Sequence, residues 1–586
     1  MLLFSIYQYG VHRLYGFSVY PDEFGYWAIA AQWVGYDWSE AASLGSYYSF
    51  GYSLILAPIL MFCRNAVTAY RAAVAVNMIL QCISAGLLWG IFRRLSGPTG
   101  GPEGLARKMG AVSATGIAVF YPVWTFYMQT TLTESLLAFL YVLICYQFIL
   151  LFENKKIWSV VISAGCLSLS FLFLYYIHMR TVGVVIAAAA TMILYLWHRP
   201  AYRKVLFAGI CILIGGAAAG MWIKGYVTGT VYAAADTGVL SRNDYAGQIA
   251  SVRKIFTGPG MIQFLQSCAG KLYYLGMASF GLFLPAAAVC IKKTARLFAC
   301  LFRKRTEETE NAGNWLSFFL LFSMLGQFFV TAVFTSSPGR LDGIFYGRYN
   351  EYLLPVFMGI GVLLLLESRR PWKILLINIG ILAVLFGITL YTALQSDADL
   401  MYGFFAAGIS YLSGSMYSWQ ALPELVKSFL FGLFLMAFVT GAVYMSRNSR
   451  WNICMTGMLL LMEILLTICL NSKYTWHFND TNYYDLKLYE YIDSYEAEHQ
   501  DVPVSYLYGG GVQYIDLIQF AMQGQTIEIL REKDESGNSP EWESLRDSFP
   551  EEGFLIVDSD SGYLEELEKN CRKCKEGSSF VLFWTE

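Results

Sequence analysis

The chain has 586 residues, of which 56% are hydrophobic and only 14% are charged, and its formal net charge is −2. Soluble globular proteins carry roughly 25% charged residues, so this composition argues against a soluble protein and indicates a chain that crosses a membrane many times. The small net charge gives no indication of a nucleic-acid partner. Most of the 12 cysteines are isolated in apolar stretches, where a thiol packs as a small hydrophobic group, and they predict no disulfide framework.

The number of membrane spans follows from the apolar stretches, since about 20 apolar residues cross a bilayer as a helix. Residues 1–17 are apolar but short for a full span, and no signal-peptide cleavage site is evident after them. Longer apolar stretches lie near residues 71–92, 109–128, 133–152, 157–177, 182–198, 205–224, 272–291, 315–335, 351–367, 373–393, 425–445 and 451–470. Together with the first segment they predict a polytopic α-helical protein of about 13 transmembrane helices.

The loops between these stretches differ in charge. Lys and Arg gather in alternate loops, such as "FRRLSGPTGGPEGLARK", "HRPAYRK" and "ESRRPWK". Short loops rich in Lys and Arg remain in the cytoplasm, which predicts a multi-pass plasma-membrane protein with a cytoplasmic N-terminus. The same rule places residues 18–70, and all residues after 470, on the outer face.

The chain is expected to form two domains, a transmembrane domain over 1–470 and an extracytoplasmic domain over 471–586. In the outer loop 18–70, "FGYWAIAAQWV" and "FGYSLILAPILMF" are too short to span and are expected to lie along the membrane surface. Short strand-like runs after residue 470, such as "VPVSYLY", "GFLIVD" and "FVLFWT", alternate with helical ones and predict a small α/β domain. The "GGG" after the first run lacks the G-x-G-x-x-G spacing, so it predicts a tight turn.

Two further segments near the C-terminus carry notable residues. The segment 473–487, "KYTWHFNDTNYYDLK", is rich in aromatics and amides, as sugar-contacting surfaces often are, but a connecting segment on the lipid headgroups is the favoured interpretation. Cys571 and Cys574 have the C-x-x-C spacing of redox or metal sites. Without a second pair, and with basic flanks that suggest a surface helix, a local disulfide or two free thiols is expected.

Several charged residues fall on the predicted outer face, where charge in or beside a membrane span is costly and marks function. They are Asp22, Glu23, Glu134, His178, Arg180, Lys271, Arg340, Asp342 and Arg348. A carboxylate beside guanidinium groups suits a reaction in which an acceptor hydroxyl loses its proton to a general base. The departing phosphate would be bound bidentately by arginine.

Each of these groups also has a structural interpretation. Pro21 with the acidic pair that follows it suits the first turn of a helix. Glu134 suits the start of a helix by the same argument. Arg180 can extend to lipid headgroups, and His178 is more readily structural than catalytic.

Taken in order, these positions resemble the motifs of the GT-C glycosyltransferases, polytopic enzymes that use polyprenyl-phosphate-linked sugars. Similar members include protein O-mannosyltransferases and the aminoarabinose transferases of lipid A. The matching segments are "YPDEFGYWAIA", "SYYSFGYSLILAPIL", "AYRAAVAVNMIL", "LTESLLAF", "HMRT" and "GRYNEYLLP". The outer domain matches more weakly.

The resemblance implies a membrane glycosyltransferase whose general base is Asp22 and which inverts the anomeric carbon, with Glu23 orienting the acceptor or its helix. The donor phosphate would be bound by Arg180, Arg348, Tyr349 and Lys271, and the substrates would contact Glu134, His178 and Arg340. The implied partners are a polyprenyl-phosphate-sugar lipid, a glycan, lipid or protein acceptor, and membrane lipids. No "WWD"-type motif of diphosphate-donor enzymes is found, so a monophosphate donor without an obligatory metal is expected.

Other function classes remain open at this stage. A polyprenyl-lipid flippase or polysaccharide exporter would usually show paired halves with broken helices, and no such symmetry is visible in the sequence. An inactive sensor or scaffold with an outer domain is a third class. A polymerase or ligase of lipid-linked glycans would also bind polyprenyl lipids, but with reactive Arg and His in a large outer loop.

Overall fold

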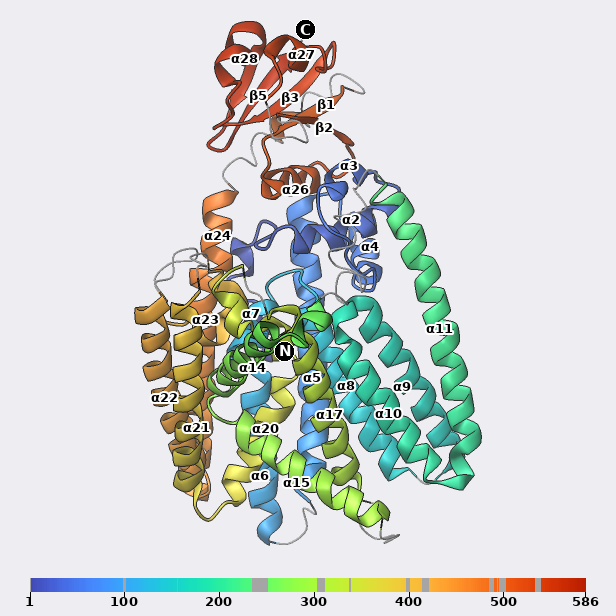
Figure 1. The fold of residues 1–586 in the computed structure, drawn as a ribbon, viewed down its shortest axis with the longest axis vertical. Coiled ribbons are helices and arrows are strands. Elements are labelled where there is room, and N and C mark those ends of the chain that lie inside the picture. Colours follow the sequence, from blue (N-terminus) through green and yellow to red (C-terminus); the bar gives the residue numbers. More distant parts are fainter. Residues whose placement is uncertain are drawn as a thin grey trace.

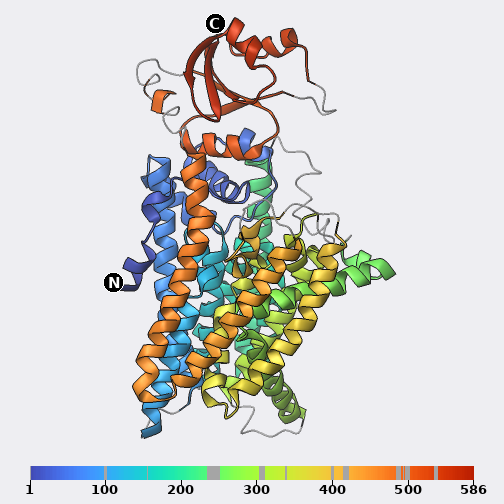
Figure 2. The same ribbon diagram turned by 90° about the vertical axis from the view of Figure 1, so that its left-hand side faces the viewer.

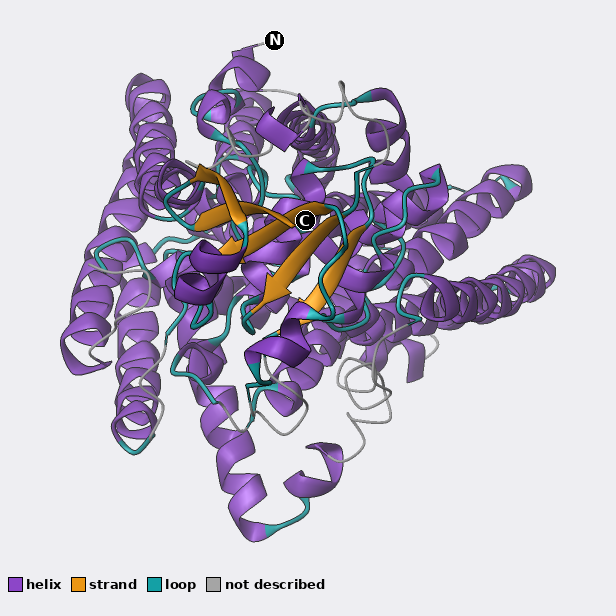
Figure 3. Cartoon of the chain, turned by 90° about the horizontal axis from the view of Figure 1, so that it is seen from above, coloured by secondary structure: helices purple, strands orange, loops and turns teal. Residues whose placement is uncertain are grey.

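The structure is a computed structural model that describes residues 2–97, 102–154, 156–233, 251–302, 311–336, 339–396, 401–413, 421–483, 490–492, 494, 502–532 and 539–585. Long helices form a bundle, and the C-terminal α/β domain covers one end of it (Figure 1). Short helices lie between the bundle and this domain. Seen from above, the sheet lies over the middle of the bundle (Figure 3).

The helices fall into a long set and a short set. The long helices are α5 (Ala66–Leu95), α6 (Pro102–Val119), α8 (Glu134–Glu153), α9 (Ile157–Ile177), α10 (Val182–Trp197), α11 (Arg203–Thr230), α14 (Gly258–Ala278), α15 (Phe283–Phe302), α17 (Ala312–Phe334), α20 (Leu354–Glu367), α21 (Pro371–Leu394), α22 (Ala421–Met445) and α23 (Ser449–Lys473). The short ones are α1 (Leu2–Tyr7), α2 (Asp22–Val34), α3 (Ser39–Ser43), α4 (Ser53–Phe62), α7 (Pro122–Tyr127), α18 (Asp342–Phe345), α19 (Arg348–Glu351), α24 (Thr475–Asn482), α26 (Val512–Ala521), α27 (Trp542–Arg546) and α28 (Leu564–Asn570). Short 3-10 turns are η1 (Val11–Arg13), η2 (Met179–Thr181), η3 (Pro200–Tyr202) and η4 (Gly403–Ile409).

Fewer helices qualify as membrane spans than the sequence predicts. Among the described residues, nine helices are long and apolar enough to cross a membrane, or up to eleven if each of two bent helix pairs is one span. The first expected helix is short, since α1 ends at Tyr7. The helix expected over 109–128 ends at Val119, and α7 begins at Pro122, which has no backbone N–H to continue a helix.

The span expected over 272–291 is a corner between two helices. The helix direction bends by 108° between α14 and α15. Phe280 and Gly281 between them have φ angles of 54° and 77°, in the left-handed region that ends helices. Hydropathy does not detect this corner because both arms are apolar.

Gly281→Ala is expected to lower the free energy of unfolding by about 1–3 kcal/mol, because an L side chain is strained at this φ and its Cβ would come within 2.7 Å of Met436. Thermal unfolding in detergent measures the change. Gly387→Ala, at a helical glycine with open space around it, is the control and is expected to be neutral or stabilising. Equal effects of the two substitutions would contradict this account of the corner.

The C-terminal domain contains a five-stranded sheet of order β2-β1-β3-β5-β4. Its strands are β1 (Val504–Tyr508), β2 (Ile527–Arg531), β3 (Gly553–Asp558), β4 (Arg572–Glu576) and β5 (Phe580–Thr585). β1 pairs in parallel with β2 and β3, and β5 pairs in antiparallel fashion with β3 and β4. This confirms the small α/β domain. The surface helix expected around Cys571 and Cys574 is wrong, because β4 runs through this segment; both thiols are free.

Helices cover both faces of this sheet. α27 and α28 lie on the face away from the bundle, and α26 lies on the face toward it (Figure 1). The "GGG" segment is the turn between β1 and α26, with Gly510 at a φ of 115°. α26 rests on the short helices below: Phe520 packs on Trp27 with ring centroids 5.0 Å apart, and Trp38 Nε1 donates to the Gln523 carbonyl oxygen at 3.0 Å.

Candidate active site

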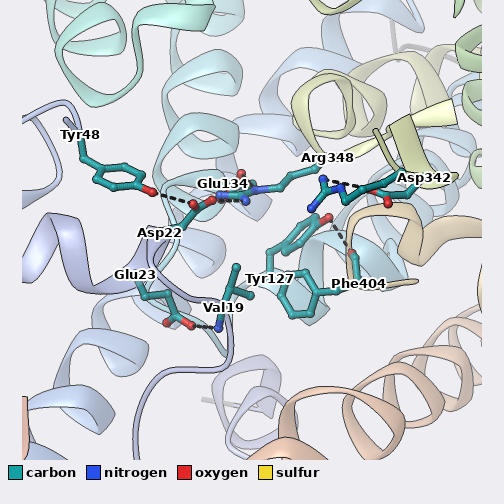
Figure 4. A network of polar contacts seen from close by, with 10 residues as sticks. Val19, Asp22, Glu23, Tyr48, Tyr127, Glu134, Asp342, Arg348 and Phe404 are labelled. Carbon is teal, nitrogen blue, oxygen red and sulfur yellow. Dashed lines mark hydrogen bonds and ion pairs between the residues drawn. The ribbon is translucent and has the colours of Figure 1, made fainter. Parts of the chain in front are cut away.

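Asp22 begins α2, one of the short helices above the bundle. Figure 4 shows Asp22 between Tyr48 and Arg348, with Glu134 behind them. The Tyr48 hydroxyl donates to Asp22 Oδ1 at 2.9 Å. Arg348 Nη1 donates to Asp22 Oδ2, and its Nε donates to Glu134 Oε1. One guanidinium therefore joins two carboxylates that lie far apart in the sequence.

The three charged side chains of this cluster differ in their exposure to solvent. Arg348 and Glu134 are almost completely buried, whereas a quarter (25%) of the Asp22 side-chain surface is exposed. Burial alone would raise the pKa of Asp22, but the charge and hydrogen bond of Arg348, together with the Tyr48 hydroxyl, hold this pKa below its ordinary value. Asp22 is therefore an ionised carboxylate with an accessible edge, as a general base requires.

Glu23, the next residue, points away from Asp22 and toward Val19 (Figure 4). Its Oε1 accepts the N–H groups of Ser18 at 2.7 Å and Val19 at 3.0 Å. Its Oε2 accepts the N–H and hydroxyl of Thr131 at 2.6 and 2.7 Å and the Tyr70 hydroxyl at 2.9 Å. Burial raises its pKa, and these hydrogen bonds act in the opposite direction. Fully enclosed, Glu23 anchors the turn that carries Asp22 and does not face a substrate.

A pocket of about 760 Å³ opens beside Asp22. Residues of the turn before α2, the segment 340–349, η4 and the α23–α24 junction line it. Its cationic side chains are Arg340 and Lys473, and its aromatic wall includes Tyr346, Tyr402 and Phe405. The pocket therefore combines one carboxylate with positive charge and flat rings, a lining that suits a phosphorylated sugar.

The two cationic side chains of the pocket are held differently, Arg340 by a carboxylate and Lys473 by carbonyl oxygens. Arg340 is one-third exposed, pairs with Asp342 at 3.0 Å, and lies over the Tyr402 ring at 4.6 Å. Lys473 Nζ donates to the carbonyl oxygens of Ser410 and Tyr411 at 3.1 and 2.9 Å. Those two oxygens carry no formal charge, so they do not neutralise the ammonium group.

Arg180 and His178 approach Asp22 from the turn before α10. The Arg180 guanidinium lies 4.1 Å from the Phe334 ring centroid and 4.2 Å from that of Tyr349, and its charge also lowers the pKa of Asp22. His178 Nδ1 accepts a hydrogen bond from the backbone N–H of Arg180 at 3.3 Å. The His178 ring contacts the Tyr349 ring edge-on. His178 thus orients the turn, while Arg180 is held by ring contacts near the carboxylate.

Lys271 does not reach this pocket. It is buried, and its Nζ donates to Ser267 Oγ at 2.8 Å and to the carbonyl oxygens of Gly343 and Ile344 at 3.1 and 3.4 Å. These contacts hold α14 against α18. The geometry therefore favours a structural role for Lys271 over the phosphate contact expected from the sequence.

Some residues that contact Asp22 or line the pocket were not expected from the sequence. Tyr48 carries no signal beyond the aromatic richness of its segment. Lys473 and His477 lie in the segment 473–487, for which a connecting role was favoured; its described part forms the end of α23 and α24 and lines the pocket. Residues 484–487 lie outside the described residues. Among the described residues, no group of three His, Cys, Asp or Glu is arranged to hold a metal ion.

No protein-family model and no curated protein matches this chain. Among solved structures, ArnT from Cupriavidus metallidurans bound to undecaprenyl phosphate matches with a TM-score of 0.54 and 11% identity, over 100% of this chain and 96% of that chain. The apo form of the same protein matches with a TM-score of 0.53 and 12% identity, over 100% and 97%. At this identity the likeness concerns the fold alone, and it confirms the expected polytopic helical architecture with a small C-terminal domain.

Proposed function

We propose that this chain is a membrane glycosyltransferase that moves a sugar from a polyprenyl-phosphate donor to an acceptor at the outer face of the plasma membrane. The observation that carries the proposal is Asp22, an ionised carboxylate at the wall of a pocket whose other charged lining residues are Arg340 and Lys473. The fold shared with ArnT, one structure of which contains undecaprenyl phosphate, supports the choice of donor.

The reaction assigned to this pocket is a single displacement. Asp22 accepts the proton of an acceptor hydroxyl or amine, and the acceptor atom attacks the anomeric carbon of the donor. The bond between that carbon and the phosphate oxygen breaks, and the polyprenyl phosphate leaves with the electron pair. Attack opposite the leaving group inverts the anomeric configuration.

Positive charge near Asp22 stabilises the leaving phosphate. Arg180, held between two rings near Asp22, is assigned to the donor phosphate, and Tyr349 contacts both this arginine and the pocket. Arg348 is committed to Asp22 and Glu134, so its role is to keep the base ionised and oriented. Arg340 and Lys473, which line the pocket, contact the sugar or the acceptor.

The side of the membrane on which the pocket lies is inferred from the charge of the loops. The pocket lies on the side of the bundle that carries the C-terminal domain, and loops rich in Lys and Arg favour the cytoplasm. We therefore infer a cytoplasmic N-terminus and an extracytoplasmic C-terminal domain. Nucleotide sugars are confined to the cytoplasm, so a lipid-linked donor fits this side.

Arg180→Gln is expected to raise the KM for the lipid donor by about 10–100-fold, because a charge-assisted hydrogen bond to phosphate contributes about 1.5–3 kcal/mol. Purified protein in lipid nanodiscs, supplied with undecaprenyl phosphate carrying pentose, aminopentose or hexose and with a cell-envelope extract as the source of acceptors, would be assayed for release of undecaprenyl phosphate. Arg370→Gln, an exposed arginine before α21, is the matched control. An unchanged donor KM in Arg180→Gln would remove Arg180 from the phosphate site, and no release with any donor would count against the proposed function.

A further inference from the structure

α24, the end of the last candidate membrane span that lies nearest the C-terminal domain, is attached to the turn that carries Asp22. We propose that Asn479 of α24 is a positioning residue for Asp22, and that α24 is a structural part of the active site rather than a connector to the outer domain. This inference rests on the proposed function, because it assigns Asn479 a role in the reaction of Asp22. Figure 2 shows the continuous helical path from the bundle to the outer domain on which α24 lies.

Asn479 is 1% exposed, and all of its hydrogen-bonding capacity is used. Its Oδ1 accepts the backbone N–H groups of Tyr15 at 2.7 Å and Gly16 at 3.1 Å. Its Nδ2 donates to Ser18 Oγ at 3.0 Å and to the Thr475 carbonyl oxygen in its own helix at 2.9 Å. A single amide thus fixes three residues of a segment that is far away in sequence, because it combines a carbonyl acceptor with two N–H donors.

The segment held by Asn479 leads directly to the base. Ser18 accepts from Asn479, and the N–H groups of Ser18 and Val19 bind the carboxylate of Glu23, which is adjacent to Asp22. A displacement of residues 15–18 would therefore be transmitted to the start of α2. Because a general base must lie within hydrogen-bonding reach of its proton, such a displacement lowers the rate without removing any reacting group.

A second residue of α24's end reinforces the same attachment. The Tyr483 hydroxyl donates to the Phe17 carbonyl oxygen at 3.0 Å and also lies 3.0 Å from the Tyr20 hydroxyl. Four residues earlier than Tyr483, Asn479 occupies the neighbouring position on the helical face. Arg13 and Asp480 form an ion pair beside them.

His477 and Thr481, on the side of α24 opposite Asn479, line the pocket, and Phe478 and Asn482 line it as well. One short helix therefore fixes the base-bearing turn with one face and forms a pocket wall with another. α26 packs on the same turn through Phe520, whose ring centroid lies 4.4 Å from that of Phe17. The C-terminal domain thereby stabilises the geometry of the base and the pocket together.

The experiment compares Asn479→Leu with Asn378→Leu in the full-length protein in nanodiscs. Asn378 is also a buried asparagine, donating to the Gly281 carbonyl oxygen at 2.9 Å, but it lies in α21, away from the pocket. Asn479→Leu is expected to lower kcat by at least about tenfold with little change in the donor KM, and to accelerate amide hydrogen exchange over residues 15–24. Asn479→Asp keeps the acceptor for the two N–H groups but loses both donated hydrogen bonds and sets an oxygen against the Thr475 carbonyl oxygen, so its kcat is expected to lie between those of the wild-type protein and Asn479→Leu.

The outcomes separate positioning from folding. If Asn479→Leu does not accumulate, Tyr483→Phe removes only a hydroxyl and is expected to give a smaller change of the same kind. An unchanged kcat in Asn479→Leu, or an equal loss in Asn378→Leu, would overturn the inference. If the wild-type protein releases no carrier phosphate, the proposed function fails, whereas unchanged amide exchange over residues 15–24 in Asn479→Leu overturns the attachment itself.

Discussion

Asp22→Asn is expected to lower kcat/KM for sugar transfer by about 10²–10⁴-fold, the range that a general base contributes. The amide is isosteric and can keep the hydrogen bond from Tyr48, so the fold is expected to be retained. The lipid donor should still bind, because Arg180 and the pocket walls are unchanged. Kinetics in nanodiscs and a donor-binding measurement on the same preparation would separate the two effects.

The pH dependence gives a second signature of Asp22. The pKa of this carboxyl is lowered in the folded protein, so the base remains ionised at neutral pH. Transfer is expected to be insensitive to pH in the neutral range, and to fall on acidification only once the pH passes below the ordinary range of an aspartate. An acid limb near neutral pH, or an Asp22→Asn variant with more than half of the wild-type rate, would contradict the assignment.

Arg348→Met is expected to be strongly destabilising as well as inactive. It leaves the buried Glu134 carboxylate and Asp22 without their shared counter-charge, and breaking a buried ion pair by removing one partner costs about 3–5 kcal/mol. Any residual activity should show its acid limb at higher pH, because the charge of Arg348 is what lowers the pKa of Asp22. Unfolding in detergent and the pH profile of kcat/KM measure the two effects.

The double variant Glu134→Gln/Arg348→Met separates stability from chemistry. Neutralising Glu134 removes the buried unpaired charge, so most of the lost stability is expected to return. Activity is not expected to return, because Asp22 remains without its arginine. Recovery of activity together with stability would show that Arg348 matters only for folding, and would contradict its role beside the base.

Much of the architecture could be predicted from the sequence. Long apolar stretches identify membrane helices because a lipid environment demands about 20 apolar residues. The corner at Gly281 could not be predicted, since hydropathy averages over a window and carries no backbone angles. In the outer domain, β3 and β5 are continuous apolar runs and were expected. β4, an exposed strand of charged residues, resembles a surface helix in composition and was misassigned.

The candidate site was predicted in part. Asp22, Glu134 and Arg348 were selected as candidate site residues because they are charged groups beside apolar segments. In the structure these three side chains are in contact. Their division of roles depends on distances that no local pattern encodes. Glu23 has the same chemistry as Asp22, yet its side chain turns toward five donor groups and is enclosed. Asn479 lies in the amide-rich segment 473–487, but nothing distinguished it from its neighbours, since its importance lies in contacts with residues more than 450 positions away.

Transfer of a sugar from a lipid-linked donor requires Asp22 as the base if the proposed function is right. The most direct test is mass spectrometry of envelope glycans, lipids and proteins from cells that express the wild-type chain or Asp22→Asn at equal levels. We expect a sugar-sized mass increment on one acceptor class with the wild-type chain and its loss with Asp22→Asn, while the unused lipid-linked donor accumulates. Identical acceptor masses in both cells, with a changed distribution of the lipid donor across the membrane, would contradict the account and indicate transport.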